Sequence, residues 1–219
     1  MVVVDNDVVL KVACYSLHDE FLTATTISES PPALLGVGKY VVEGRIKRSR
    51  TLSNRDRAGA SFDAILARAF MLEPDDEELA LAADFETSAR EKGLELDTGE
   101  SQLLAIAINR RCCLMITGDK RAIRAIAVVC PEAVEKRIAC LEQLIGQMVH
   151  LSGLPVVQAK VCSEPLADRA ISICFGCSSG GTDAGNVLAG LHSYIRDLQN
   201  DAVGVLFPET NLETLAASA

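Results

Sequence analysis

The chain of 219 residues has no apolar run that approaches the length of a membrane-spanning helix, which needs about 20 apolar residues. It also lacks the basic segment that opens a signal peptide, because Asp5 and Asp7 follow the first three valines at once. These two absences argue against a membrane protein and against an exported one. We therefore expect a cytoplasmic protein with no membrane partner.

A second closely spaced cysteine pair, which would complete a zinc ribbon, is missing although the chain has eight cysteines. Cys174 and Cys177 form the one CxxC pattern. The other six cysteines lie in largely apolar surroundings, where a free thiol acts as a small hydrophobic side chain. A structural zinc would need His150, His192 or Cys162 as further ligands. We expect reduced thiols rather than disulfides or zinc, and whether Cys174 and Cys177 bind anything stays open.

The phosphate-binding pattern Gly-x4-Gly-Lys-Ser/Thr is absent too, because Lys39 is followed by Tyr40. Net positive charge is also lacking, since the formal charge is −9 at pH 7. That value does not exclude nucleic-acid binding, because local patches decide. Two basic groups are present, and each alone is more often a solvated helix face. They are Arg45, Lys47, Arg48, Arg50, Arg55 and Arg57, and then Arg110, Arg111, Lys120, Arg121 and Arg124.

Residues 97–124 predict a helix, a buried strand and a second helix, with an acid at the start of each helix. Asp97 and Glu100 have the spacing of a capping box. The short apolar run 113–116 suits a buried strand, and Asp119 follows where that strand ends. In an open α/β sheet, ligands bind at the carboxyl ends of the strands. Asp119 is therefore where we expect a working carboxylate.

The rest of the chain predicts more strands and helices. Val2–Val4 is typical of a buried strand, which places Asp5 at a strand end; the alternative is that Asp5 or Asp7 merely caps the next helix. A long helix is expected from Pro131, because apolar residues then recur at steps of four and three. Residues 152–155 are the best domain boundary. The other expected elements are strands over 23–27 and 203–207, helices over 33–48, 62–70, 75–92, 166–175 and 184–198, and loops over 49–60 and 178–183.

Four features, taken in order, resemble the PIN-domain nucleases. They are Asp5 after the first strand, Glu43 in Tyr40-Val-Val-Glu43, Gly99-Glu100 opening a helix, and Thr117-Gly-Asp119 after a strand. The resemblance covers about residues 1–130 and implies a three-layer α/β/α fold with a central, mainly parallel sheet. With it we expect a nuclease domain over residues 1–150 and a mainly helical C-terminal extension over residues 151–219.

The resemblance also implies a metal-dependent endoribonuclease that hydrolyses RNA phosphodiester bonds. Carboxylates that converge at strand ends hold Mg²⁺ or Mn²⁺ through oxygen ligands, and the metal activates a water. We expect Asp5, Glu100 and Asp119 as metal ligands, with Glu43 assisting directly or through water. Thr117 would bond a ligand carboxylate or the attacking water. No histidine lies in this group of residues to act as a base, and the roles of Asp7 and Asp97 stay open.

RNA, single-stranded or structured, is the expected partner, with the basic residues contacting its backbone. The resemblance also implies that the chain forms a homodimer. Whether an antitoxin-like protein is a partner stays open. One alternative is a catalytically inactive PIN-like module for protein interaction, which the acidic charge, the heptad-like helix and the C-terminal extension favour. Another is a different α/β phosphate enzyme, such as a phosphatase. The RNA target, the cleavage site and the role of residues 151–219 stay open.

Overall fold

The computed structural model describes residues 1–180 and 182–212. Its five-stranded sheet has the order β3-β2-β1-β4-β5, and every strand pair is parallel. Short apolar runs suffice for such strands, because helices cover both faces of a parallel sheet. The strands are β1 (Val2–Val4), β2 (Ala33–Leu35), β3 (Phe70–Leu72), β4 (Leu114–Thr117) and β5 (Ile138–Cys140). The helices are α1 (Asn6–Tyr15), α2 (His18–Thr25), α3 (Gly38–Arg48), α4 (Arg55–Leu66), α5 (Asp76–Glu91), α6 (Thr98–Asn109), α7 (Lys120–Val129), α8 (Leu141–Ser152), α9 (Leu154–Ser163), α10 (Arg169–Cys174) and α11 (Ala184–Asp201).

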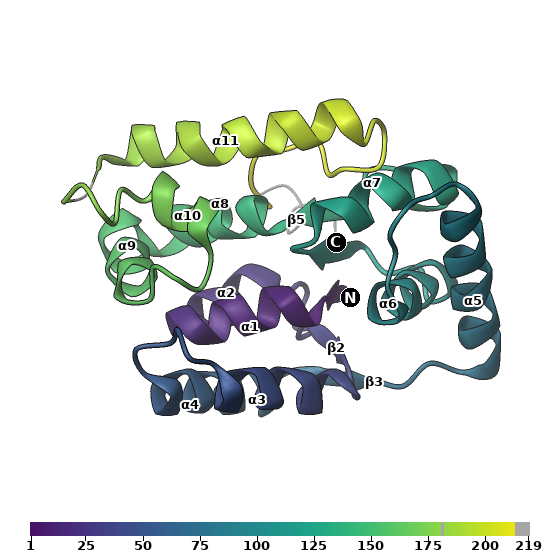
Figure 1. Ribbon diagram of the computed structural model, residues 1–219, viewed down its shortest axis with the longest axis horizontal. Coiled ribbons are helices and arrows are strands. Elements are labelled where there is room, and N and C mark those ends of the chain that lie inside the picture. Colours follow the sequence, from purple (N-terminus) through teal and green to yellow (C-terminus); the bar gives the residue numbers. More distant parts are fainter. Residues whose placement is uncertain (181, 213–219) are drawn as a thin grey trace.

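Helices pack on both faces of the sheet. Successive strand residues point to opposite faces, so Val2 and Val4 join a buried cluster with α1, α2, α3, α4 and α8. Val3 instead joins a second cluster with α6 and α7. Figure 1 shows α5 and α6 on one side of the sheet and α1 to α4 on the other. The chain therefore has the predicted α/β fold, with a parallel sheet between helical layers.

The strand order reverses between β1 and β4. The chain adds β2 and β3 on one side of β1, then returns to add β4 and β5 on the other. Val4 pairs with Ile116, and the N–H of Asp5 donates to the Ile116 carbonyl at 2.9 Å. Asp5 and Thr117 therefore lie side by side at the carboxyl edge. The crevice at such a reversal is where open α/β sheets bind ligands.

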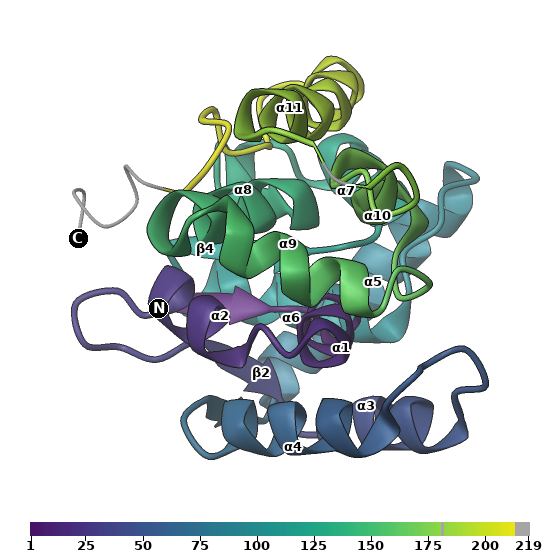
Figure 2. The same cartoon turned by 90° about the vertical axis from the view of Figure 1, so that its left-hand side faces the viewer.

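The C-terminal segment packs on the same core as the sheet. Val157 of α9, Phe175 after α10 and Val187 of α11 belong to the buried cluster that contains Val2 and Val4. Figure 2 shows α8 and α9 stacked over α1 and α2. Gly153 alone separates α8 from α9, and its φ of +81° favours glycine. The proposed boundary at 152–155 is thus a tight turn between two helices.

Several predicted elements are confirmed and others are wrong. The helices at 75–92, 97–109 and 184–198 are confirmed. The prediction of a strand over 23–27 is wrong, because the residues up to Thr25 belong to α2. The Thr25 hydroxyl donates to the Phe21 carbonyl, four residues earlier in the helix, at 2.7 Å. The helix over 33–48 begins only at Gly38, because Ala33–Leu35 pairs with β1 on one side and β3 on the other.

Two of the remaining errors arise from three-residue strands, which carry no period of their own. The long helix expected from Pro131 is a short 3-10 turn (Glu132–Val134), then β5, then α8. The helix over 62–70 ends at Leu66, and Phe70 begins β3. The loop over 49–60 already contains the start of α4, and residues 203–207 contribute one bridge, Leu206 to Ile138, instead of a strand. The predicted loop 178–183 contains position 181, which, like 213–219, is outside the described residues.

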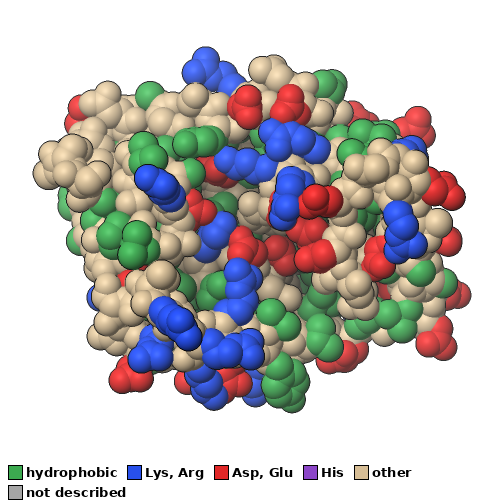
Figure 3. All heavy atoms as spheres, viewed as in Figure 1, with side chains coloured by type: hydrophobic (Ala, Val, Ile, Leu, Met, Phe, Trp, Pro, Cys, Tyr) green, Lys and Arg blue, Asp and Glu red, His purple; other side chains and the backbone are tan. Residues whose placement is uncertain are grey.

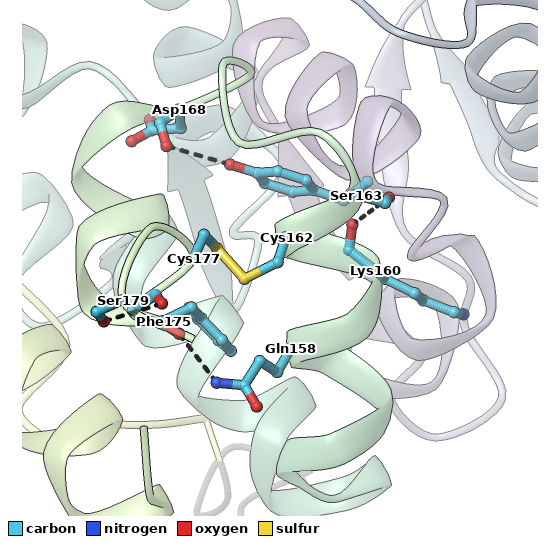
Figure 4. Close-up of a disulfide and its surroundings, with 10 residues drawn as sticks. Gln158, Lys160, Cys162, Ser163, Asp168, Phe175, Cys177 and Ser179 are labelled. Atoms are coloured by element: carbon cyan, nitrogen blue, oxygen red, sulfur yellow. Dashed lines mark hydrogen bonds between the residues drawn. A yellow bond between two sulfur atoms is a disulfide. The ribbon is translucent and has the colours of Figure 1, made fainter. Parts of the chain in front are cut away.

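A disulfide joins Cys162 and Cys177, so the prediction of reduced thiols is wrong for this pair. The bond links the end of α9 to the turn after α10, which lie close only because the chain folds back between them (Figure 4). No local pattern indicates that approach, since the two cysteines are 15 positions apart. Cys174 stays a free, buried thiol, so the CxxC pattern is not a metal pair.

No helix in the described ranges is both long and apolar enough to cross a membrane.

Candidate functional site

A pocket of about 480 Å³ lies at the carboxyl ends of β1 and β4. We call it the acidic pocket, because five carboxylates line it together with the basic residues Lys11, Arg45 and Arg121. The space-filling view shows acidic side chains gathered in a central hollow with Lys and Arg around them (Figure 3). The five carboxylates are Asp5, Asp7, Asp97, Glu100 and Asp119.

Asp5 is held at the end of β1 by its neighbours from β4. The Thr117 hydroxyl donates to Oδ2 of Asp5 at 3.4 Å, and the N–H of Asp119 donates to the Thr117 oxygen at 3.2 Å. Asp5 is only 8% exposed. Burial raises the pKa of Asp5 to about 6, and the negative charge of Asp7 adds to the rise. The strand register therefore fixes a carboxylate that is costly to ionise.

Asp97 and Glu100 form the predicted capping box at the start of α6. The N–H of Glu100 donates to Asp97 Oδ1 at 2.8 Å, and the N–H of Asp97 donates to Glu100 Oε2 at 3.1 Å. Burial raises the pKa of Glu100 to about 8, helped by the charges of Asp97, Asp5 and Asp119. No ion pair reaches Glu100 from any described residue. The capping motif thus carries a buried acid into the pocket with no cation in direct contact with it, although the charge of Arg121 acts on it from a distance.

Asp119 caps α7 and is already paired with a cation. Its Oδ1 accepts the N–H of Arg121 at 2.8 Å, and the Arg121 guanidinium contacts Oδ2, also at 2.8 Å. Burial acts to raise the pKa of Asp119, but the side-chain and backbone hydrogen bonds from Arg121 lower it overall. Arg121 also pairs with Glu95 at 2.6 Å. Of the predicted ligands, Asp119 is therefore the one whose charge is most fully balanced.

Asp7 lies between two cations at the rim of the pocket. Lys11 Nζ is 2.7 Å from Asp7 Oδ2 and 2.9 Å from Asp168 Oδ2. Arg45 reaches the other oxygen of Asp7 at 3.4 Å. Gly118 allows the Asp7 carboxylate to lie close to the turn after β4, because a Cβ at position 118 would be only 2.9 Å from that carboxylate. The sequence spacing of Asp7 and Lys11 could have indicated this pair, whereas nothing local indicated Asp168.

Glu43 does not join the acidic pocket. Its carboxylate accepts a 2.5 Å hydrogen bond from Lys47, which lowers the pKa of Glu43. It lines a different pocket, between α3 and α4. Residues four apart share a face of a helix, so α3 turns Val41 and Arg45 toward the acidic pocket and Glu43 away from it.

The donor set of the pocket has the chemistry of a site for a hard divalent cation, but its side chains are not arranged as one. Carboxylate oxygens suit Mg²⁺ or Mn²⁺. Burial raises the pKa values of Asp5 and Glu100, repulsion from neighbouring carboxylates adds to the rise, and a bound cation would offset both effects. Yet no three Asp, Glu, His or Cys side chains within the described ranges are grouped so that they could hold a metal ion. Binding by Asp5, Glu100 and Asp119 requires Asp119 to exchange its contacts with Arg121.

Comparison with known proteins identifies no relative that would help to interpret this site. The chain matches no protein-family model, no curated protein and no solved structure. The acidic pocket is therefore interpreted from its own residues and from its place in the sheet.

Proposed function

We propose that this chain is a metal-dependent endoribonuclease of the PIN-like type, which hydrolyses RNA phosphodiester bonds in the acidic pocket. The observation that carries the proposal is the gathering of carboxylates from three separate segments where the strand order reverses. Buried acids so close together repel one another. Keeping Asp5 and Glu100 unpaired costs stability, and this cost favours a role in binding or chemistry over a role in folding.

Asp5, Glu100 and Asp119 would hold the metal, and Glu43 is left out because it faces another pocket. A bound Mg²⁺ or Mn²⁺ would lower the pKa of a water and stabilise charge developing at phosphorus. Thr117 keeps the Asp5 carboxylate in place through its hydroxyl. Asp97 orients Glu100 through the capping box.

The cations at the rim bind and orient the RNA backbone. Lys11 and Arg45 line the pocket beside Asp7 and would donate N–H groups to a phosphate, although Asp7 and Asp168 already balance their charges. If Asp119 bound the metal, Arg121 would keep its contact with Glu95 and would offer the guanidinium nitrogen released by Asp119 to a phosphate oxygen. The chain supplies no histidine at the pocket among its described residues.

The test is cleavage of a mixed-sequence single-stranded RNA, with Mn²⁺ and with EDTA. Wild type should cut only with the metal. The cleavage rate of Asp119→Asn should fall by more than the roughly 10–100-fold that is typical when a residue that only orients a metal ligand is replaced. Asp84→Asn is the matched control, because Asp84 is exposed on α5 and lines no part of the acidic pocket; it should cut like wild type. Intact RNA after incubation with folded wild type and Mn²⁺ would contradict the proposal.

The second candidate is the catalytically inactive PIN-like module, with an antitoxin-like protein rather than RNA as its partner. One observation favours it: Arg121 occupies both oxygens of Asp119, and no metal-ready group exists in the part of the chain that the structure describes. In that case Mn²⁺ would not raise the melting temperature of Arg121→Ala, in which Asp119 has lost its partner. In a nuclease, the same variant should still bind Mn²⁺, because Arg121 is not a ligand.

A further inference from the structure

A second pocket, of about 430 Å³, opens beside the acidic pocket. The two share Asp7, Lys11 and Arg45, so they lie on either side of these three residues. We call the second pocket the basic groove, because Arg48 and Arg50 also line it. Figure 3 shows Lys and Arg side chains gathered below the acidic hollow, over α3 and the loop that follows.

The groove holds two positive charges with no internal partner. Lys11 and Arg45 are balanced by Asp7 and Asp168. Arg48 and Arg50 are exposed, and no described residue forms an ion pair with either. In a chain of net charge −9, two adjacent free arginines at a pocket rim are suited to an anion.

The groove also has an apolar wall. Leu10 and Leu52 line it, and Leu166 does so although 70% of its surface is exposed. Leu166 lies in the segment between α9 and α10. A ligand that places an anion on the arginines and a flat apolar group on these leucines would satisfy both parts.

The segment that carries Leu166 is fastened at both ends. Glu164 is 1% exposed and accepts the N–H groups of Ser53 and Asn54, each at 2.8 Å. Asp168 holds Lys11 at 2.9 Å. The disulfide between Cys162 and Cys177 closes the loop that contains both acids (Figure 4). The C-terminal segment thus builds a fixed wall of the groove, and a fixed wall lowers the entropy cost of binding.

We propose that the basic groove binds one nucleotide of a single-stranded nucleic acid, next to the phosphodiester that enters the acidic pocket. Arg48 and Arg50 take its phosphate, and Leu52 and Leu166 take the face of its base. The position of the neighbouring phosphodiester rests on the proposed function, whereas the nucleotide site itself does not. This assigns the C-terminal segment a place in substrate binding.

The test is binding of a labelled eight-nucleotide single-stranded RNA to the full chain by fluorescence anisotropy, in EDTA. The double variant R48A/R50A should bind at least tenfold more weakly. For single strands, log K falls with log salt by about 0.7 per neutralised phosphate, so losing the one phosphate that both arginines hold should flatten the slope by about 0.7. Leu166→Ala should weaken binding by a few fold and leave the salt slope unchanged.

Arg68→Ala is the matched control, because Arg68 is an exposed arginine just before β3 and lines neither the basic groove nor the acidic pocket. It should bind like wild type. Equal binding by wild type and R48A/R50A would overturn the inference, and so would a nucleoside monophosphate that binds as tightly as the strand. Weakening by Arg68→Ala as large as that by R48A/R50A would also overturn it.

The two proposals fail separately. Since binding is measured without metal, an inactive protein that binds RNA through Arg48 and Arg50 would refute the nuclease and support the groove. An active nuclease whose KM is unchanged in R48A/R50A would refute the groove alone.

Discussion

Helices α5 and α6 begin with the same capping box in opposite electrostatic surroundings. Asp75 and Glu78 exchange backbone hydrogen bonds in α5, and Asp97 and Glu100 do so in α6. Both glutamates are buried, Glu78 completely and Glu100 to within 5% exposure. As local structure, the two motifs are equivalent.

The difference lies in what faces each glutamate. Arg110 donates to both oxygens of Glu78, at 2.7 Å each, and these hydrogen bonds lower the pKa of Glu78. Glu100 has no such partner, and burial raises its pKa to about 8. A capping box alone therefore does not indicate a functional site. The lack of a cation in contact with its buried carboxyl makes Glu100, and not Glu78, the candidate.

The largest expected loss of stability comes from removing Arg110, the partner of Glu78. Arg110→Met would leave Glu78 buried and unpaired, which costs about 3–5 kcal/mol of unfolding free energy. Urea unfolding at pH 7 measures this, with Arg90→Met as control because Arg90 is an exposed arginine on α5. A loss no greater than that of the control would mean that Glu78 does not depend on Arg110.

The next-largest effect is a pH dependence of the unfolding free energy that differs in sign between Glu100 and Glu78. A carboxyl whose pKa is raised on folding binds more protons in the folded state, so its contribution to stability is present at low pH and lost as pH rises. For Glu100, with an ordinary value of 4.5 and a folded value of about 8, the loss spans roughly pH 5 to 8. Glu100→Gln should remove this loss and be more stable than wild type at pH 8.5, by roughly 2–4 kcal/mol.

Glu78→Gln provides the opposite sign. Because the pKa of Glu78 is lowered on folding, its contribution is present above the ordinary value and lost as pH falls through the acid range. This variant should therefore be less stable than wild type at pH 7, with a difference that narrows toward acid pH. Parallel pH profiles of the two glutamine variants would contradict the comparison.

The smallest expected effect is shared by the two boxes. Asp75→Ala and Asp97→Ala each remove one N-cap hydrogen bond and should each cost about 1 kcal/mol at pH 5. At pH 8 Asp97→Ala should cost less than Asp75→Ala, because it also removes a negative charge that repels Glu100. Thermal unfolding at the two pH values measures both differences.

The acids at the strand ends were predictable, and their pairing was not. Asp5 and Asp119 follow short apolar runs, and parallel strands bring such residues to one edge. The Asp97–Glu100 box was visible in the spacing. The contacts of Asp119 with Arg121, and of Lys11 with Asp168, depend on side-chain directions and on a distant segment, which spacing does not encode.

The fold shows the same division. Helices of ten or more residues with regular apolar spacing were found, including α5, α6 and α11. The strands β2, β3 and β5 were missed, because three buried residues fit a helix as well as a strand. The disulfide between Cys162 and Cys177 depends on the fold-back of α9 and α10, which no local pattern revealed.

The most direct test is whether the Asp97–Glu100 box, which lacks an ion pair, belongs to a cation site and the Asp75–Glu78 box, which is paired with Arg110, does not. Thermal unfolding with Mn²⁺ in hundredfold excess over its dissociation constant should stabilise wild type by about 2.7 kcal/mol. Asp75→Ala should keep this gain, and Glu100→Gln should lose most of it. No Mn²⁺ stabilisation of wild type, or an equal gain in Glu100→Gln, would contradict the account.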